Sequence, residues 1–177
     1  MNRKMLGLLA VPSVLASVLA SAGSASAGQT GTDSVINPPG IYHLSTETSL
    51  NRCLVVFANG SQGSAATLTQ CAAFDDQSWS VPAAGTTGEI RNKYYKNTYG
   101  TGCLTVQGDS LGAPAFIYDC TGLRDQKWSA ELIPFHNGSV RLRNVNSGKC
   151  LVVQGSSDGT AAMQYTCGNF ADQYWLA

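Results

Sequence analysis

Short segments of the chain alternate apolar and polar residues with a period of two. In the stretch SVRLRN, Val140 and Leu142 fall on one face, whereas Arg141 and Arg143 fall on the other. This alternation is typical of a β-strand that is buried on one side. Clusters of Gly, Asn, Ser and Asp separate such segments at residues 58–64, 108–114 and 155–160. Because these clusters favour hairpin turns and helical periodicity is nearly absent, the pattern predicts an all-β domain.

One unit of this pattern occurs three times. Each copy contains CLxV, a second Cys 17 or 18 residues after the first, and Gln-x-Trp that places its Trp eight residues further on. The tetrad Asp-Gln-x-Trp begins at residues 76, 125 and 172, and it contains all three Trp of the chain. A leading strand is expected in each copy, at 40–44, 88–93 and 138–145. Such periodicity indicates a repeated supersecondary unit, and we predict about twelve short strands, four per repeat, in a closed threefold arrangement.

The beginning of the chain has a different composition. Arg3 and Lys4 precede an apolar run from about residue 5 to residue 20, and small residues follow up to Ala27. This order predicts a secretory signal peptide over residues 1–27, followed by a flexible polar tail over 28–39. One domain is expected over 40–177, with repeats at about 40–87, 88–137 and 138–177. The alternative is an uncleaved membrane anchor, for which the run is short and rich in Ala and Ser.

The charge pattern narrows the possible partners. Lys and Arg number 11, as do Asp and Glu, and charged residues make up only 12% of the chain. No basic patch is present that would attract nucleic acid or anionic lipid. We therefore expect no nucleic-acid partner and no membrane insertion. A monomer is expected as well. The abundance of neutral hydrogen-bonding residues suits a neutral polyhydroxyl ligand.

The number of cysteines bears on how the chain is cross-linked. Six Cys in an exported chain predict three disulfides, for which 15 pairings are possible from number alone. A metal site is the alternative, but CxxC spacing and His partners are absent from the sequence. We predict neither a metal nor a cofactor.

The three in-phase copies of CLxV, second Cys and Gln-x-Trp resemble the ricin B-type lectins, a family of β-trefoil domains that also occur as carbohydrate-binding modules. The resemblance covers residues 40–177 and implies a β-trefoil with one potential sugar site and one disulfide in each repeat. The implied pairs are Cys53–Cys71, Cys103–Cys120 and Cys150–Cys167. The period of two supports this pairing, because turning the apolar residues of CLVV and AATLTQC inward leaves Cys53 and Cys71 on the same outer side.

The Gln-x-Trp motif itself is expected to be structural. A large aromatic in every repeat suits the core better than a sugar platform, and the Gln amide can bind the backbone of a loop.

The resemblance also implies where a sugar would bind. Family members typically carry Asp two residues after the first Cys, an aromatic two residues before the second, and Asn before the Gln of Gln-x-Trp. Here Val55, Thr105 and Val152 replace the first Asp, so that carboxylate is missing in every repeat. The candidate ligand-binding residues are Thr105, Tyr118, Asp125 and Gln126 in the middle repeat and Tyr165, Asp172 and Gln173 in the third.

The first repeat, with Val55 and Thr69 at these positions, is expected not to bind. The alternative for the other two repeats is that Tyr118 and Tyr165 only shield the disulfides.

No enzymatic motif is present, since GxSxG, HExxH and a phosphate loop are all absent from the sequence. We therefore predict no catalytic residues and a secreted, lectin-like protein that binds a neutral glycan, of the galactose or xylose type by resemblance, chiefly at the middle repeat. The alternative is a protein-binding trefoil, such as an inhibitor or toxin subunit, that has lost sugar binding.

Overall fold

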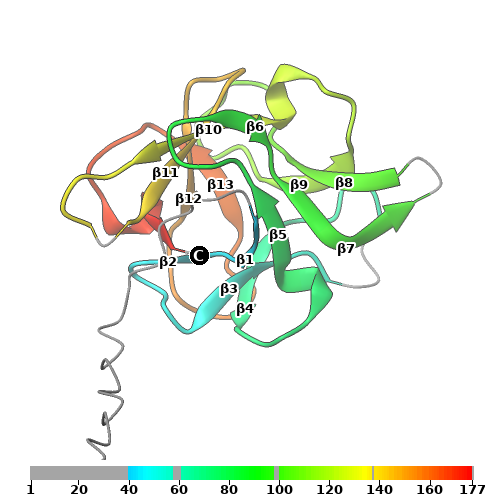
Figure 1. Ribbon diagram of the computed structural model, residues 1–177, viewed down its shortest axis with the longest axis horizontal. Helices are drawn as coiled ribbons and strands as arrows, with labels where there is room; N and C mark the ends of the chain where they lie inside the picture. Colours follow the sequence, from blue (N-terminus) through cyan, green and yellow to red (C-terminus); the bar gives the residue numbers. More distant parts are fainter. Residues whose placement is uncertain (1–39, 58–60, 98–99, 137, 177) are drawn as a thin grey trace, which may run out of the picture. The chain divides into compact units, whose positions relative to one another are not determined.

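The computed structural model describes residues 40–57, 61–97, 100–136 and 138–176. The predicted signal peptide and polar tail, residues 1–39, lie outside this part of the chain. The described residues form fourteen β-strands and three short 3₁₀ helices (Figure 1). None of their helices has the length and apolar character that crossing a membrane requires.

The strands follow the repeats. The first repeat contains β1 (Gly40–His43), β2 (Ser45–Thr46), β3 (Arg52–Val55), β4 (Thr67–Gln70) and β5 (Ser78–Val81). The second contains β6 (Thr87–Glu89), β7 (Arg91–Asn97), β8 (Gly100–Thr105), β9 (Phe116–Asp119) and β10 (Lys127–Leu132). The third contains β11 (Val140–Asn144), β12 (Cys150–Val153), β13 (Ala162–Tyr165) and β14 (Trp175–Leu176). The 3₁₀ helices η1 (Asp75–Gln77), η2 (Arg124–Gln126) and η3 (Ala171–Gln173) each precede the last strand of a repeat.

The number of strands exceeds the predicted twelve because two leading strands are divided. Leu44 separates β1 from β2, and Ile90 separates β6 from β7. At each break the chain changes partner: β1 pairs with β5 whereas β2 pairs with β14, and β6 pairs with β10 whereas β7 pairs with β5 and β8. The interruption therefore marks the point where one strand passes from one sheet to the next.

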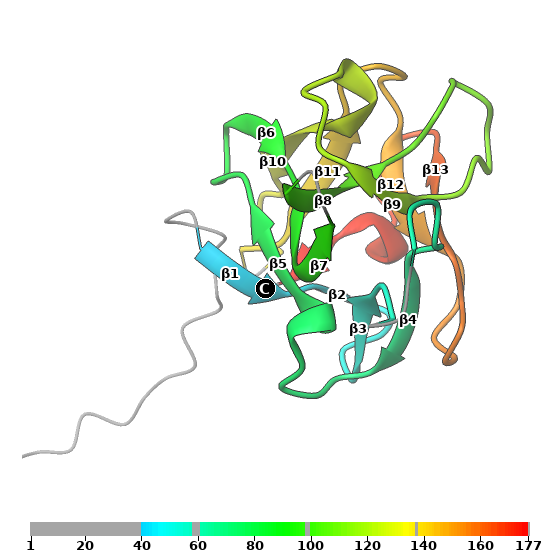
Figure 2. The same cartoon turned by 90° about the vertical axis from the view of Figure 1, so that its right-hand side faces the viewer.

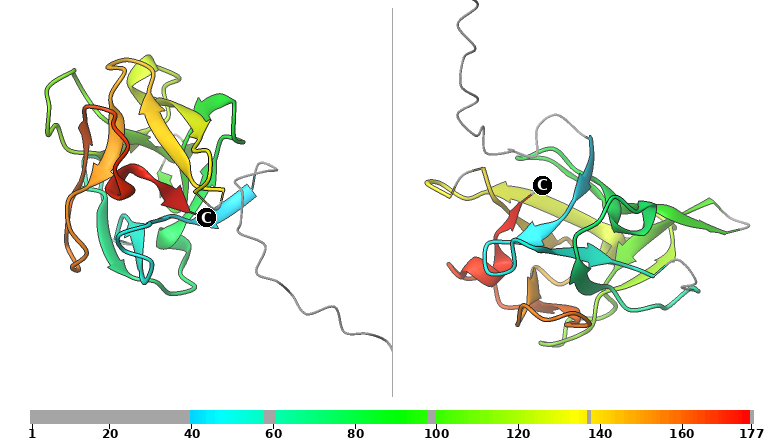
Figure 3. Two further views of the ribbon diagram at one scale, coloured as in Figure 1. Left: turned by 90° about the vertical axis from the view of Figure 1, so that its left-hand side faces the viewer. Right: turned by 90° about the horizontal axis from the view of Figure 1, so that it is seen from below.

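Sheets extend across the repeat boundaries. One sheet has the order β1-β5-β7-β8-β9, a second has the order β13-β12-β11-β10-β6, and β3 and β4 form a separate hairpin. The last strand, β14, pairs with β11 and with β2 (Figure 3). This pairing places Trp175 opposite Thr46. The third repeat is thereby joined to the first, which closes the ring of three repeats.

The core is built from the inward residues of these strands. Leu54, Val56, Ala66 and Leu68 are all buried in it, as their alternation predicts. Each Trp of the Gln-x-Trp motifs is fully buried, and its indole Nε1 donates to a backbone carbonyl on a neighbouring strand. The pairs are Trp79–Leu54 at 2.8 Å, Trp128–Leu104 at 2.9 Å and Trp175–Leu151 at 3.1 Å. The prediction that these Trp belong to the core is confirmed.

The disulfide pairing is also confirmed. The bonds join Cys53 to Cys71, Cys103 to Cys120 and Cys150 to Cys167, one within each repeat. Each closes a loop of 17 or 18 residues, which corresponds to about 3 kcal/mol in the chain-entropy model.

Candidate functional site

The Gln of each Gln-x-Trp motif fixes the loop that follows the second Cys. In the middle repeat, Gln126 Oε1 accepts from the N–H of Thr121 at 2.7 Å, and Nε2 donates to the carbonyl of Asp119 at 2.7 Å. Gln77 and Gln173 make the equivalent pair of bonds in the other repeats, at 2.9–3.1 Å. All three side chains are buried. The predicted loop contact is therefore present in every repeat.

The outer face of the middle repeat lies across β7, β8 and β9. Cys103 is directly opposite Arg91 on one side and Tyr118 on the other. Side chains opposite one another in an antiparallel sheet share a face, so Tyr118 stands beside the disulfide. Phe116, opposite Thr105, meets Tyr118 edge-on with ring centroids 6.3 Å apart. Phe116 was not among the predicted site residues. Because it lies two residues before Tyr118 on the same strand, the period of two could have placed both side chains on one face.

Thr105 lies beneath this face. Its side chain is 1% exposed, and its hydroxyl donates to the carbonyl of Cys103 at 3.0 Å and accepts from Gln126 Nε2 at 3.2 Å. Thr105 and Gln126 are thus brought together, as predicted, but in a buried hydrogen-bond network. Their direct contact with a ligand stays a prediction.

Asp125 is half-buried at the start of the second Gln-x-Trp motif. Its backbone carbonyl accepts from the N–H of Val106 at 3.3 Å and from Asn144 Nδ2 at 2.9 Å. Its Oδ1 atom is buried and, among the described residues, has no hydrogen-bond partner; the same holds for Oδ1 of Asp76 and Asp172. Burial raises the pKa of the Asp172 carboxyl above its ordinary value, and a backbone N–H only partly offsets this.

In the third repeat, three neighbouring strands again place an Arg, a Cys and a Tyr in one row, as β7, β8 and β9 do in the middle repeat. Cys150 lies opposite Arg143 on β11 and Tyr165 on β13, and Tyr165 is 39% exposed. Arg143 pairs with Glu131, as Arg91 pairs with Glu89 in the middle repeat. This recurring Arg–Glu pair, whose Arg lies across the Cys from each Tyr, was not predicted, because the register across strands is needed to place it.

The first repeat lacks this row. Thr69 lies opposite Cys53, at the place that Tyr118 and Tyr165 occupy in the other repeats, and Val55 is fully buried.

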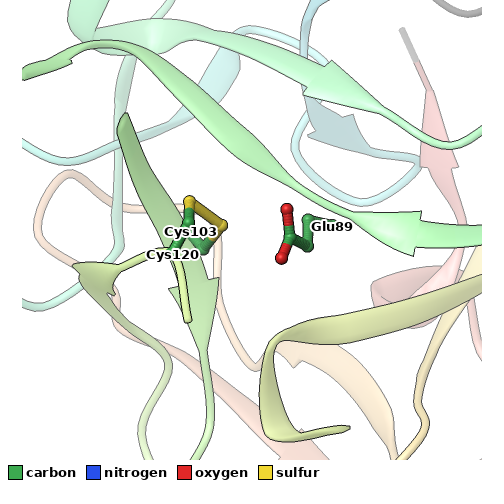
Figure 4. A group of neighbouring side chains, drawn as sticks. All are labelled: Glu89, Cys103 and Cys120. Carbon is green, nitrogen blue, oxygen red and sulfur yellow. A yellow bond between two sulfur atoms is a disulfide. The ribbon is translucent and has the colours of Figure 1, made fainter. Parts of the chain in front are cut away.

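Glu89 lies beside the disulfide of the middle repeat (Figure 4). One carboxylate oxygen and the sulfurs of Cys103 and Cys120 are all within 4.8 Å of one another. Since the two sulfurs are bonded to each other, they are not thiolates and cannot act as metal ligands in this form. The carboxylate accepts from Arg91 Nε at 2.9 Å instead, and the ion pair forms a charged border to the outer face.

The closed ring of three disulfide-bonded β units, each with a buried Gln-x-Trp, defines a β-trefoil. The sequence matches the ricin-type beta-trefoil lectin domain over residues 86–177, more than half of the chain. The chain therefore belongs to the ricin-type β-trefoil lectin family, and the prediction of both family and fold is confirmed. This lectin domain is not itself catalytic.

Solved structures show the same fold. The designed threefold-symmetric protein ThreeFoil is 25% identical, with a TM-score of 0.66 over 77% of this chain and 96% of its own. The hemolytic lectin CEL-III is 29% identical, with a TM-score of 0.61 over 78% of this chain and 30% of its own. The exo-beta-1,3-galactanase 1,3Gal43A from Clostridium thermocellum is 23% identical, with a TM-score of 0.61 over 80% of this chain and 30% of its own. The chain thus spans less than a third of the length of these two natural proteins. No curated protein sequence matches the chain.

Proposed function

We propose that the protein is a secreted lectin that binds a neutral glycan, of the galactose or xylose type, chiefly on the outer face of the middle repeat. The observation that carries this proposal is the position of Tyr118 beside the Cys103–Cys120 disulfide in a chain of the lectin family. An aromatic ring there offers a flat apolar surface to the C–H groups of a sugar ring. Membership in the family supports carbohydrate binding in general.

The other residues of the middle repeat have supporting roles in this proposal. Asp125 accepts hydrogen bonds from sugar hydroxyls, whereas Thr105 and Gln126 hold the strand and loop beneath Tyr118 in place. Without the family Asp, a charge-assisted hydrogen bond of about 1.5–3 kcal/mol is missing. The Thr105 hydroxyl does not replace it, because it is buried and already bonded to Cys103 and Gln126. We therefore expect single-site dissociation constants of about a millimolar.

The third repeat would serve as a second, weaker site. Tyr165, Asp172 and Gln173 occupy the corresponding positions. Two linked sites can bind a polysaccharide more tightly than either binds alone.

The test is glycan retention by wild type and by Tyr118→Ala, measured by affinity electrophoresis through galactan and xylan. Tyr118→Ala should lose most of the retention while its unfolding curve stays close to wild type, because the residue is not in the core. Phe135→Ala, which removes a fully exposed aromatic elsewhere, is the matched control and should retain its binding. Unchanged retention in a folded Tyr118→Ala protein would show that the site is wrongly placed.

Secretion is part of the same proposal. The three disulfides support an oxidising compartment. N-terminal sequencing of the exported protein should begin at or within a few residues of Gly28, and a membrane-bound form that keeps Met1 would contradict export with cleavage.

A second candidate function is protein binding without sugar binding. The observation in its favour is the replacement of the family Asp by Val55, Thr105 and Val152 in all three repeats. If wild type binds no glycan on an array that an unrelated trefoil lectin does bind, this second candidate takes the place of the first.

A further inference from the structure

A hollow of about 410 Å³ lies between the first and second repeats. It is lined by Ala73, Phe74, Asp75, Asp76 and Tyr94. The first four precede or form η1, whereas Tyr94 belongs to β7, which packs beside η1 (Figure 2). Phe74 and Tyr94 do not occupy positions of the family's sugar site, whereas Asp76 is the first repeat's counterpart of Asp125.

Asn92 fixes the two sides of the hollow to each other. Its Nδ2 donates to the carbonyl of Asp76 at 2.8 Å, and its Oδ1 accepts from the N–H groups of Tyr94 and Tyr95 at 3.1 Å each. The register of β7 shifts between Asn92 and Lys96, and Tyr95 is buried in the core. Tyr94 is thereby held at the surface next to Asp76 by a buried amide.

Both aromatic rings are available to a ligand. Phe74 is 64% exposed and Tyr94 is 48% exposed. The ring contacts found in the described part of the chain join other residues, namely Phe116 with Tyr118 and His136 with Tyr174. The two rings therefore border the hollow from different repeats without packing on each other.

The charge in the hollow is negative and only partly balanced. Asp75 Oδ1 pairs with Lys93 Nζ at 2.7 Å on the rim. Asp76 has no ion pair among the described residues, and its Oδ1 lacks a hydrogen-bond partner there. The face of an aromatic ring carries a partial negative charge. The two rings and this carboxylate therefore all attract a cation.

The junction between the second and third repeats has the same backbone arrangement but different side chains. Asn144 Nδ2 donates to the carbonyl of Asp125 at 2.9 Å, and Asn144 Oδ1 accepts from the N–H groups of Asn146 and Ser147. Leu123 and Asn146 take the places of Phe74 and Tyr94 there, and Arg124 takes the place of Asp75. Asp125 takes the place of Asp76, and its Oδ1 is likewise buried without a hydrogen-bond partner among the described residues. The aromatic lining is therefore not required by the trefoil scaffold, whereas the carboxylate recurs.

We propose that this hollow is a binding site for an organic ammonium ion. The cation contacts the faces of Phe74 and Tyr94 and is neutralised by Asp76. This site is independent of the glycan site proposed for the middle repeat, because it uses different residues and a different chemistry.

Titration calorimetry of the full mature chain tests the proposal with two probes of the same shape. Choline carries a permanent positive charge, whereas 3,3-dimethyl-1-butanol has a carbon atom in place of the nitrogen. Choline should bind saturably, and the uncharged alcohol should bind at least tenfold more weakly.

Variants locate the site. The double variant Phe74→Leu with Tyr94→Asn installs the side chains of the second junction, so it should fold normally while choline binding is lost. Asp76→Asn keeps the size of the side chain and should weaken choline binding at least fivefold. Leu123→Ala, which shortens the exposed residue equivalent to Phe74, is the matched control and should bind choline like wild type.

Three results would overturn the proposal. Equal binding of choline and the alcohol would make the hollow an apolar pocket. Tighter binding of a neutral methyl galactoside, lost in the same double variant, would make it a sugar site. Choline binding that is absent, or that survives the double variant, would exclude a cation site in this hollow.

Discussion

The Gln and the Trp of the Gln-x-Trp motif bind different parts of the repeat. Trp128 points into the core and binds the carbonyl of Leu104, whereas Gln126 binds the backbone of the loop around Cys120. The amide also donates to the hydroxyl of Thr105, which ties the loop to β8. One short motif thus connects the core of a repeat to its outer face.

Asp172 is a carboxylic acid whose protonation is affected by burial. Burial raises its pKa above the ordinary value of 3.8. For an acid with a raised pKa, ionisation disfavours the folded state, so its favourable contribution is present below about pH 3.8 and is lost as the pH rises through the folded-state pKa. Asp172→Asn should therefore have a higher free energy of unfolding than wild type at pH 7, with the difference closing as the pH falls below about 4.

Urea unfolding of both proteins between pH 3 and pH 7 measures this difference. Asp109→Asn removes the same charge from an exposed loop and serves as the control. A difference between Asp172→Asn and wild type that stays constant with pH would contradict the assignment.

At the scale of the elements, the hairpin between β10 and β11 contains a strained residue. Phe135 has a φ of 66° and a fully exposed side chain. A left-handed conformation costs a residue with a Cβ about 1–2 kcal/mol, whereas Gly adopts it freely but loses about 0.5–1 kcal/mol in chain entropy. Phe135→Gly should raise the free energy of unfolding by about 0.5–1 kcal/mol.

Phe135→Ala separates backbone strain from loss of the ring, because Ala keeps the Cβ and should give no such gain. Denaturant unfolding of the two variants measures the difference. Equal stabilities for Phe135→Gly and Phe135→Ala would exclude the strain.

The elements also show what the sequence could and could not predict. The family resemblance implied the disulfide pairs, and the repeated spacing and the period of two supported them. The buried Trp could also be predicted, because both features depend on one repeat alone. The period of two placed Thr105 on the outer side of its strand. It did not predict that Thr105 is buried, with its hydroxyl hydrogen-bonded to Gln126. The bulge in β7 shifts the alternation, so the sequence did not distinguish buried Tyr95 from exposed Tyr94. The hollow was missed because its walls come from two repeats.

At the scale of the whole molecule, the repeats form one cooperative unit. All three Trp lie in one core cluster, and each of the two large sheets contains strands from more than one repeat. Trp175→Ala should cost about 3–5 kcal/mol, and the protein should still unfold in a single transition. Trp79→Ala, the same change in the first repeat, should behave alike. Coincident curves from circular dichroism and fluorescence would agree with this expectation, and a separate early transition of the third repeat would not.

The pairing of β14 with β2 brings the last strand of the described domain beside the second half of the divided leading strand of the first repeat. Trp175 faces Thr46, and the N–H of Glu47 donates to the carbonyl of Tyr174 at 3.1 Å. In such a closed ring of repeats, the chain termini could lie in another loop without changing the strand pairs. A circular permutant that joins the end of β14 to the start of β1 and opens at the exposed loop around Asp109 keeps every strand pair. Its new ends would leave from that loop, which offers a way to display the lectin in the opposite orientation.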